Sequence, residues 1–223
     1  MTSSLRLLDP QTFADLGVYV ARARRLAEDG AARMVGHGPV LAVYVAPLHG
    51  GGGPTVLGLR TLALAEPSSL DATVALAALG DRLAAVPDPG WSGAGVPLAV
   101  PPTSATGASW AGVSPPRSGW DPVGLVEPQL LRDVAAAGIA QVADGTPDAA
   151  GAQAVARLRA LVWGAQIPGM PGVPAGVAFA VEALGFLGQG PDAEPAALLR
   201  SGPWVRLTTA AGHVLGRRPA LGG

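Results

Sequence analysis

The sequence predicts an α+β protein. We expect N-terminal antiparallel strands with one or two helices, followed by a C-terminal three-helix segment closed by a β-hairpin. Two observations lead to this prediction. Residues 40–48 are rich in β-branched and aromatic side chains, residues 56–65 resemble them, and glycine and proline lie between the two runs, which is typical of antiparallel strands. After Trp120 the apolar residues instead recur every three to four positions, which is typical of helices.

The first 85 residues contain signals for further elements. Residues 5–8 predict a short strand, and Asp9 followed by Pro10 predicts a helix start, because aspartate caps a helix and proline fits its first position. Residues 71–76 predict a third strand that leads into a short helix. The apolar stripe of the first helix consists of Phe13, Leu16, Val20 and Ala23.

The middle and the end of the chain differ in character. Proline, glycine and serine interrupt residues 87–122, where 96–100 and 109–113 are candidate edge strands. We expect one helix closed by Gly145 and a second that stops at Gly164. A third helix should open at Pro174 and run through Val177, Val181, Leu184 and Leu187. Because it is apolar nearly all round, we expect it to be buried. Residues 204–207 and 213–216 predict the closing hairpin.

The change of character near residues 115–122 marks a domain boundary. We predict a mixed α/β N-terminal region over residues 1–118 and a helical C-terminal region over residues 119–223. The length of 223 residues also allows one compact domain.

Three amino-acid types are missing. The chain has no cysteine, lysine or asparagine, and all 15 of its basic residues are arginine, which is typical of GC-rich genomes such as those of actinobacteria. Schiff-base, pyridoxal-phosphate and thiol chemistry are therefore excluded. His37, His49 and His213 lie far apart without a second ligand at metal-binding spacing, so we expect neither a cofactor nor a metal.

The net charge and the hydropathy of the sequence limit the kinds of partner and the location that we expect. The net charge is −1 and there is no basic tail, so nucleic-acid binding is not expected. No uninterrupted apolar stretch reaches the roughly 20 residues that a membrane span needs. The first ten residues lack the pattern of a signal peptide, and we expect a cytoplasmic protein.

The most specific short motif is His49 followed by four glycines, directly after a predicted strand. In lipase-like α/β-hydrolases such a motif supplies the oxyanion hole. The matching G-x-S-x-G nucleophile elbow is absent from the sequence, so we expect a hairpin linker without catalytic residues. A serine hydrolase that uses Ser109 with His49 and His213 is one alternative function.

One charge lies inside the third predicted C-terminal helix. Glu182 is surrounded by apolar residues, and a buried carboxylate needs a partner. Arg206, in the predicted final hairpin, is the candidate partner for a buried ion pair.

The C-terminal region resembles the end of a winged-helix domain. The similar residues are 183–187 (ALGFL), 204–208 (WVRLT) and 212–215 (GHVL), and the resemblance spans residues 127–218. It implies a DNA-binding regulator as a second alternative function. The helix that would read bases carries no basic or amide side chain, however, and therefore favours a protein-binding version.

The small share of charged residues leads to the function that we favour. Charged residues form 14% of the chain, against about 25% in average soluble proteins. We therefore predict a non-enzymatic interaction or regulatory protein with a protein partner or a homo-oligomer. The expected interface lies in the helical half, with Arg157 and Arg159 beside Trp163.

Overall fold

The computed structural model describes residues 4–85, 94–103, 108–146, 151–188, 190 and 193–217. The chain forms two compact units, and its helices and antiparallel strands confirm the predicted α+β class. The first unit contains residues 1–46 and 59–113, and the second contains residues 47–58 and 114–223. The turn of one long hairpin therefore belongs to the second unit. Sequence analysis placed the boundary after residue 118 and included this turn in the first region.

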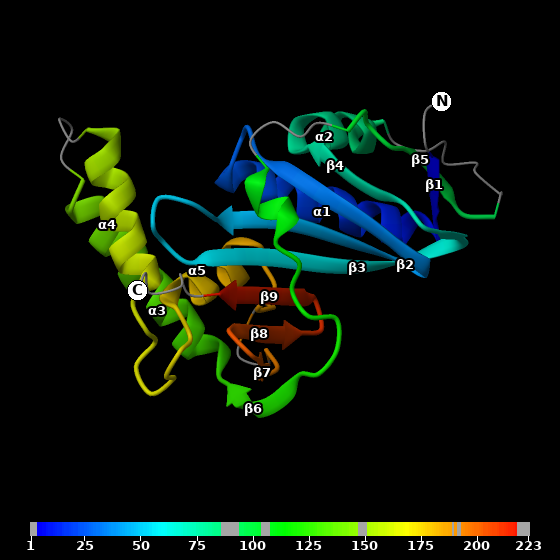
Figure 1. The fold of residues 1–223 in the computed structure, drawn as a ribbon. Helices are drawn as coiled ribbons and strands as arrows, with labels where there is room; N and C mark the ends of the chain where they lie inside the picture. Colours follow the sequence, from blue (N-terminus) through cyan, green and yellow to red (C-terminus); the bar gives the residue numbers. More distant parts are fainter. Residues whose placement is uncertain are drawn as a thin grey trace. The chain divides into compact units, whose positions relative to one another are not determined.

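The first unit is built on an antiparallel sheet. Strand β2 lies between β4 and β3, while β1 pairs with both β3 and β5. In chain order the elements are β1 (Ser4–Leu7), α1 (Pro10–Leu26), β2 (Ala31–Leu48), β3 (Thr55–Ser68), β4 (Asp71–Ala75), α2 (Leu76–Ala84), β5 (Val96–Ala99) and the 3-10 helix η1 (Ser109–Gly112) (Figure 1). Residues 47–58, which include the joined ends of β2 and β3, belong to the second unit.

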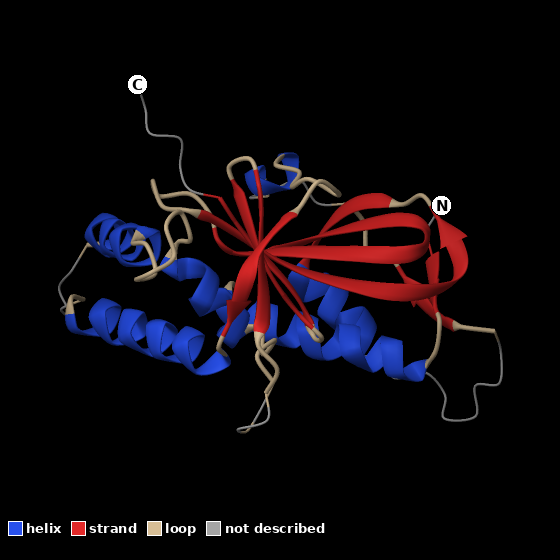
Figure 2. Cartoon of the chain, turned by 90° about the horizontal axis from the view of Figure 1, so that it is seen from below, coloured by secondary structure: helices blue, strands red, loops and turns tan. Residues whose placement is uncertain are grey.

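Helix α1 starts where the sequence predicts. Asp9 is its N-cap and Pro10 its first residue. The four residues of the predicted apolar stripe are all buried, and α1 lies along the strands of its unit (Figure 2). Asp15 accepts a 2.7 Å hydrogen bond from Nη2 of Arg60 on β3, which ties the helix to the sheet.

Two expectations for the first unit were wrong. Strand β2 begins at Ala31, nine residues before the predicted start. Residues 109–113 do not form an edge strand, because the N–H groups of Ala111 and Val113 donate to the carbonyls of Ala108 and Trp110, each at 2.9 Å, which gives η1 its tight turn.

The second unit combines a four-stranded antiparallel run with three helices. Its strands follow the order β9-β8-β7-β6, so that β6 pairs only with β7 in this run. The elements are β6 (Asp121–Val126), α3 (Pro128–Asp144), α4 (Ala152–Gly164), α5 (Ala175–Ala183), β7 (Ala196–Ser201), β8 (Trp204–Thr209) and β9 (Gly212–Arg217). Sequence analysis predicted the three helices and the β8–β9 hairpin, but it did not predict β6 and β7.

Helix α5 is buried as predicted but shorter than expected. It ends at Ala183 because Gly185 adopts a left-handed φ of 69°. The N–H of Gly185 then donates to the carbonyl of Glu182, and the N–H of Phe186 donates to that of Val181, which is a Schellman motif. No helix in the described part of the chain is long and apolar enough to cross a membrane.

The N-cap of α1 yields a pH-dependent prediction. Asp9 accepts hydrogen bonds from the backbone and side chain of Thr12, and these bonds lower the pKa of its carboxyl group. Asp9→Ala should lower the free energy of unfolding at neutral pH. Since the folded pKa lies below the unfolded one, the charge-dependent part of the stabilisation is complete above the unfolded value. It is lost as pH falls through the folded value.

Urea unfolding of wild type and Asp9→Ala at neutral and acidic pH measures how the difference in their free energies of unfolding changes with pH. Asp9→Asn is the control, because it keeps an acceptor without a titrating charge, and its stability relative to Asp9→Ala should not change with pH. If the free energies of unfolding of wild type and Asp9→Asn differed by the same amount at both pH values, the charge of Asp9 would not contribute to the stability of α1.

Candidate functional site

The glycine motif forms the turn between β2 and β3. Gly50, Gly51 and Gly52 have φ values of 81°, 64° and 76°, a left-handed conformation that residues with a Cβ atom rarely adopt. The N–H of Gly53 donates to the carbonyl of Gly50 at 3.2 Å and closes the turn. The motif forms the turn of a hairpin, as predicted, and the turn gives a conformational reason for the glycines, while the expectation that it has no catalytic role stays a prediction.

The turn packs closely against helix α4 of the same unit. A Cβ atom on Gly53 would lie 3.2 Å from Cα of Ala160, and one on Gly51 would lie 4.0 Å from Cβ of Ala156. Glycine on the turn and alanine on the helix therefore permit this approach. A larger side chain at Gly53 would have to displace the helix backbone.

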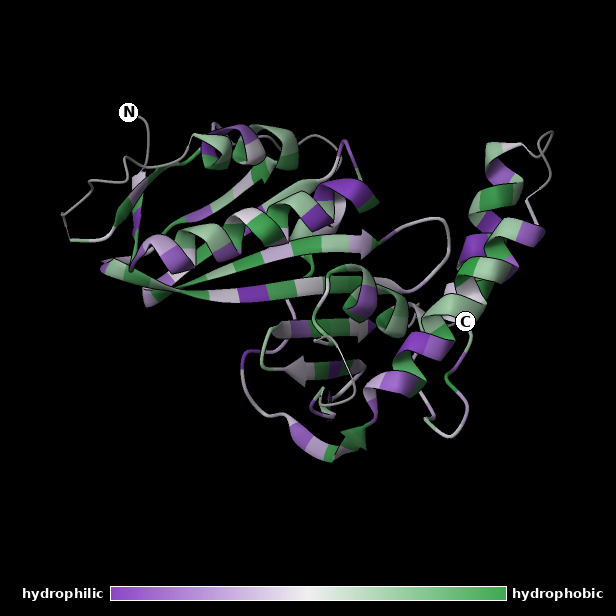
Figure 3. Cartoon of the chain, turned by 180° about the vertical axis from the view of Figure 1, so that it is seen from behind, coloured by the Kyte–Doolittle hydropathy of each residue, from purple (hydrophilic) through white to green (hydrophobic). Residues whose placement is uncertain are grey.

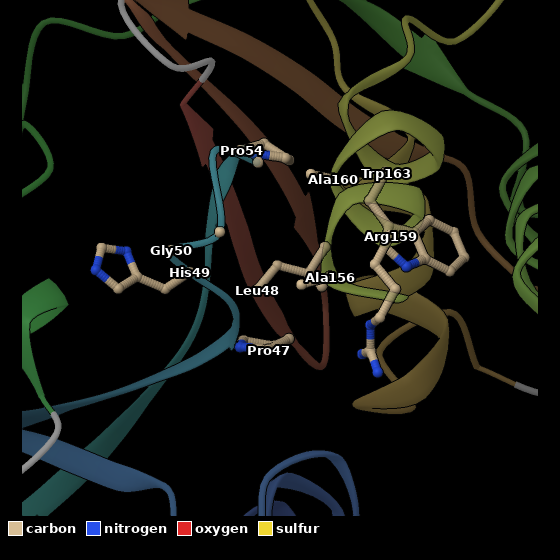
Figure 4. Close-up of a pocket in the computed structure, with 11 residues that line it drawn as sticks. Pro47, Leu48, His49, Gly50, Pro54, Ala156, Arg159, Ala160 and Trp163 are labelled. Atoms are coloured by element: carbon tan, nitrogen blue, oxygen red, sulfur yellow. The ribbon is translucent and has the colours of Figure 1, made fainter. Parts of the chain in front are cut away.

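A groove of about 270 Å³ lies between the turn and α4. Figure 4 shows its two walls, with the turn on one side and α4 on the other. Most of its lining is apolar. The lining residues are Pro47, Leu48, His49, Gly50, Gly51, Gly53, Pro54, Ala156, Arg159, Ala160 and Trp163.

Two polar side chains border the groove. His49 Nδ1 lies 3.2 Å from Oγ1 of Thr55, and its ring points away from α4 (Figure 4). Arg159 is exposed, and none of the described residues that line the groove carries a carboxylate. The groove therefore suits an apolar side chain accompanied by negative charge, and its lining offers no serine, cysteine or acid for catalysis.

Trp163 holds α4 in the second unit. Its side chain is buried and stacks on Phe179 of α5, with ring centroids 4.6 Å apart. On α3, Gly138 leaves room for the ring, because a Cβ atom there would lie 2.6 Å from Cη2 of Trp163. Sequence analysis expected Trp163 at an exposed interface, and this was wrong. The indole is the contact that attaches α4, so only the two arginines of that set face outward.

The rest of α4 is exposed or half-buried. Trp163 is its only buried residue among 13, although Gln153, Arg157 and Arg159 are its only polar side chains. Leu161 is 73% exposed, and Ile139 on α3 is 51% exposed. Figure 3 shows apolar positions along the α3–α4 pair. A helix that is apolar nearly all round is normally buried, so the exposure of α4 is unusual.

Two family models match the chain. Residues 1–112 match the Domain of unknown function DUF8010, and residues 115–221 match the Domain of unknown function DUF8185. The first match covers half of the chain. The chain belongs to the DUF8010 family. No curated protein matches the chain.

The two matches follow the division of the structure. The DUF8010 segment ends at residue 112 and the DUF8185 segment begins at residue 115, on either side of the division between Val113 and Ser114. The groove and α4 belong to the second unit. Its α4 wall lies in the DUF8185 segment, whereas the turn that forms the other wall lies in the DUF8010 segment.

The residues of the hydrolase alternative lie in both units. Ser109 belongs to η1 in the DUF8010 segment, while His49 and His213 belong to the second unit. His213 Nδ1 lies 3.0 Å from Oγ1 of Thr208, so each of these two rings has a threonine neighbour. Within the described ranges no three His, Asp or Glu side chains are grouped to hold a metal ion. The hydrolase alternative stays a prediction.

The expected buried ion pair does not form. Glu182 is exposed, and its Oε2 lies 3.8 Å from Nε of Arg132 on α3. Arg206 instead stacks over the ring of Trp120 at 4.6 Å, and its Nε is buried without a hydrogen-bond partner among the described residues. Burial lowers the pKa of Arg206. The expectation was wrong because Glu182 occupies an exposed position at the end of an otherwise buried helix.

The winged-helix resemblance stays a prediction as well, because neither matching family is described as winged-helix. Helix α5 takes the place of the base-reading helix in that comparison. Six of its nine residues are buried, which leaves little of it for contact with DNA.

Sequence reasoning missed Ala156, Ala160 and Leu161 as parts of the site. The available signal was composition, since α4 has only three polar residues and two of them are arginines. Periodicity could not reveal which apolar positions lack a partner.

The contact between Gly138 and Trp163 should be intolerant of a methyl group. Gly138→Ala should lower the free energy of unfolding by about 1–3 kcal/mol, because the buried indole cannot move away without losing its stacking on Phe179. Gly17→Ala is the matched control in α1. There a Cβ atom meets nothing within 4 Å, and alanine should stabilise the helix by about 0.5–1 kcal/mol.

Chemical denaturation of both variants, with tryptophan fluorescence as the signal, gives the two values. If Gly138→Ala stabilised the protein as Gly17→Ala is expected to do, Trp163 would not be packed against α3.

Proposed function

We propose that this protein is a non-enzymatic interaction or regulatory protein that binds a partner protein through helix α4 and the adjoining groove. The observation that carries the proposal is the exposure of α4. The helix has the composition of a buried element, and only Trp163 is buried. Its apolar positions gain stability when another protein covers them, at about 25 cal/mol per Å² of apolar surface.

The outward face of α4 has the composition of an interface. Ala154, Arg157, Leu158 and Leu161 follow the i, i+3, i+4, i+7 spacing, so they lie on one side of the helix. Leu158 is half-buried against Gly145, while Leu161 and Arg157 are exposed. An apolar centre bordered by arginine is typical of protein–protein contacts.

The groove lies on the opposite side of α4, because Ala156, Arg159, Ala160 and Trp163 line it. Its apolar walls can accept one side chain of a partner, and Arg159 at its border can pair with a partner carboxylate. This combination of pocket and cation supports recognition of a protein surface, because it offers both an anchor site and a charge that sets orientation.

Site-specific photo-crosslinking in the native cell tests the proposal. A benzophenone amino acid at Leu161 should give a light-dependent adduct of defined mass with a protein that mass spectrometry identifies. Val18 on α1 is the matched control, because it is an apolar helical residue that is 51% exposed in the first unit. We expect no adduct at Val18. Absence of any protein adduct at Leu161, or the same adducts at both positions, would contradict the proposal.

A further inference from the structure

The charges of α4 indicate an acidic partner. Arg157 and Arg159 are its only charged residues, both are exposed, and neither forms an ion pair within the described part of the chain. Arg157 lies on the same side of the helix as exposed Leu161, and an unpaired cation beside an apolar side chain disfavours basic partners and favours a surface that carries carboxylates. The partner surface should therefore be apolar and bordered by acids.

Strand β6 of this same chain has that composition. Its residues Asp121 to Leu125 are all exposed, and Val123 and Leu125 are exposed by 54% and 72%. Asp121 at the start of the strand and Glu127 just after it are exposed, and residues 121–127 contain no basic side chain. This acidic and apolar edge complements α4 in both charge and hydropathy.

The edge of β6 is poorly suited to pairing with another strand. Pro122 lacks the N–H group that a ladder needs, and the register shifts between Pro122 and Gly124. Both features protect sheet edges from extension. Side chains that pack on a helix can cover this edge, whereas a further strand cannot easily do so.

The two elements also agree in length. A helix of 13 residues and a strand of six residues each extend about 20 Å. Within one chain α4 and β6 lie apart in the second unit (Figure 1), so a contact between them requires a second copy.

We infer that the partner is a second copy of this chain, in a two-fold dimer in which α4 of each copy packs against β6 of the other. This inference rests on the proposed function and names its partner. Two-fold symmetry forms the α4–β6 contact twice, which doubles the buried area and leaves neither surface open. Leu161 meets Val123 and Leu125, and Arg157, on the same side of α4 as Leu161, faces the acids that border β6.

Charge reversal tests the inference on the full chain. The first variant carries Arg157→Glu, and the second carries Asp121→Arg and Glu127→Arg. The control reverses an exposed pair in the first unit, Asp81→Arg with Arg82→Glu. Circular dichroism checks that each variant is folded, and light scattering after size exclusion gives the mass at micromolar concentration.

The wild type and the control should have twice the chain mass of 22.1 kDa. Each interface variant should dissociate, with self-association weakened at least about tenfold, because both contacts of its dimer then join like charges. An equimolar mixture of the two variants should restore the dimer, since both contacts in the mixed dimer again join opposite charges. Misfolded variants could not produce this rescue.

A monomeric wild type, a mass above that of a dimer, variants that remain dimeric, or a mixture that stays monomeric would each overturn the inference. The proposed function would survive a monomeric wild type if the photo-crosslinker at Leu161 captured a different protein. Both would fail if the wild type were monomeric and no adduct formed.

Discussion

The packing of Trp163 is the contact on which the second unit depends. Its indole fills the space left by Gly138 on α3 and stacks on Phe179 of α5, so one side chain joins three helices. Because it is the only buried residue of α4, this anchor fixes the helix while leaving its other side chains exposed or half-buried. The exposed surface is therefore a consequence of how the helix is attached.

Small residues permit the close approaches around this anchor. Gly53 on the turn faces Ala160, and Gly145 at the end of α3 faces Leu158. A composition biased toward glycine and alanine can reflect the genome, yet at these positions the structure requires small side chains. The scarcity of charged residues can likewise reflect the genome. On α4, however, it leaves two arginines among largely apolar side chains. The functional proposal follows from where these residues lie rather than from their number.

Local signals in the sequence were sufficient for much of the fold. Asp9 and Pro10 located the start of α1, and the glycines after His49 located the β2–β3 turn, because capping and left-handed turns depend on neighbouring residues. Tertiary features were not accessible in this way. Apolar spacing could not show that Trp163 points inward while Leu161 points outward, nor that Glu182 meets Arg132 instead of Arg206. Those outcomes depend on which elements pack together, and a periodic pattern does not contain that information.

The central claim is that α4 is exposed in the single chain and covered by β6 of a second copy. Hydrogen–deuterium exchange, measured at protein concentrations below and above the dissociation constant, tests it most directly. Peptides from α4 and β6 should become protected together as concentration rises, while peptides from α2 in the first unit should not change. Exchange in α4 and β6 that is independent of concentration, or protection of only one of them, would contradict the account.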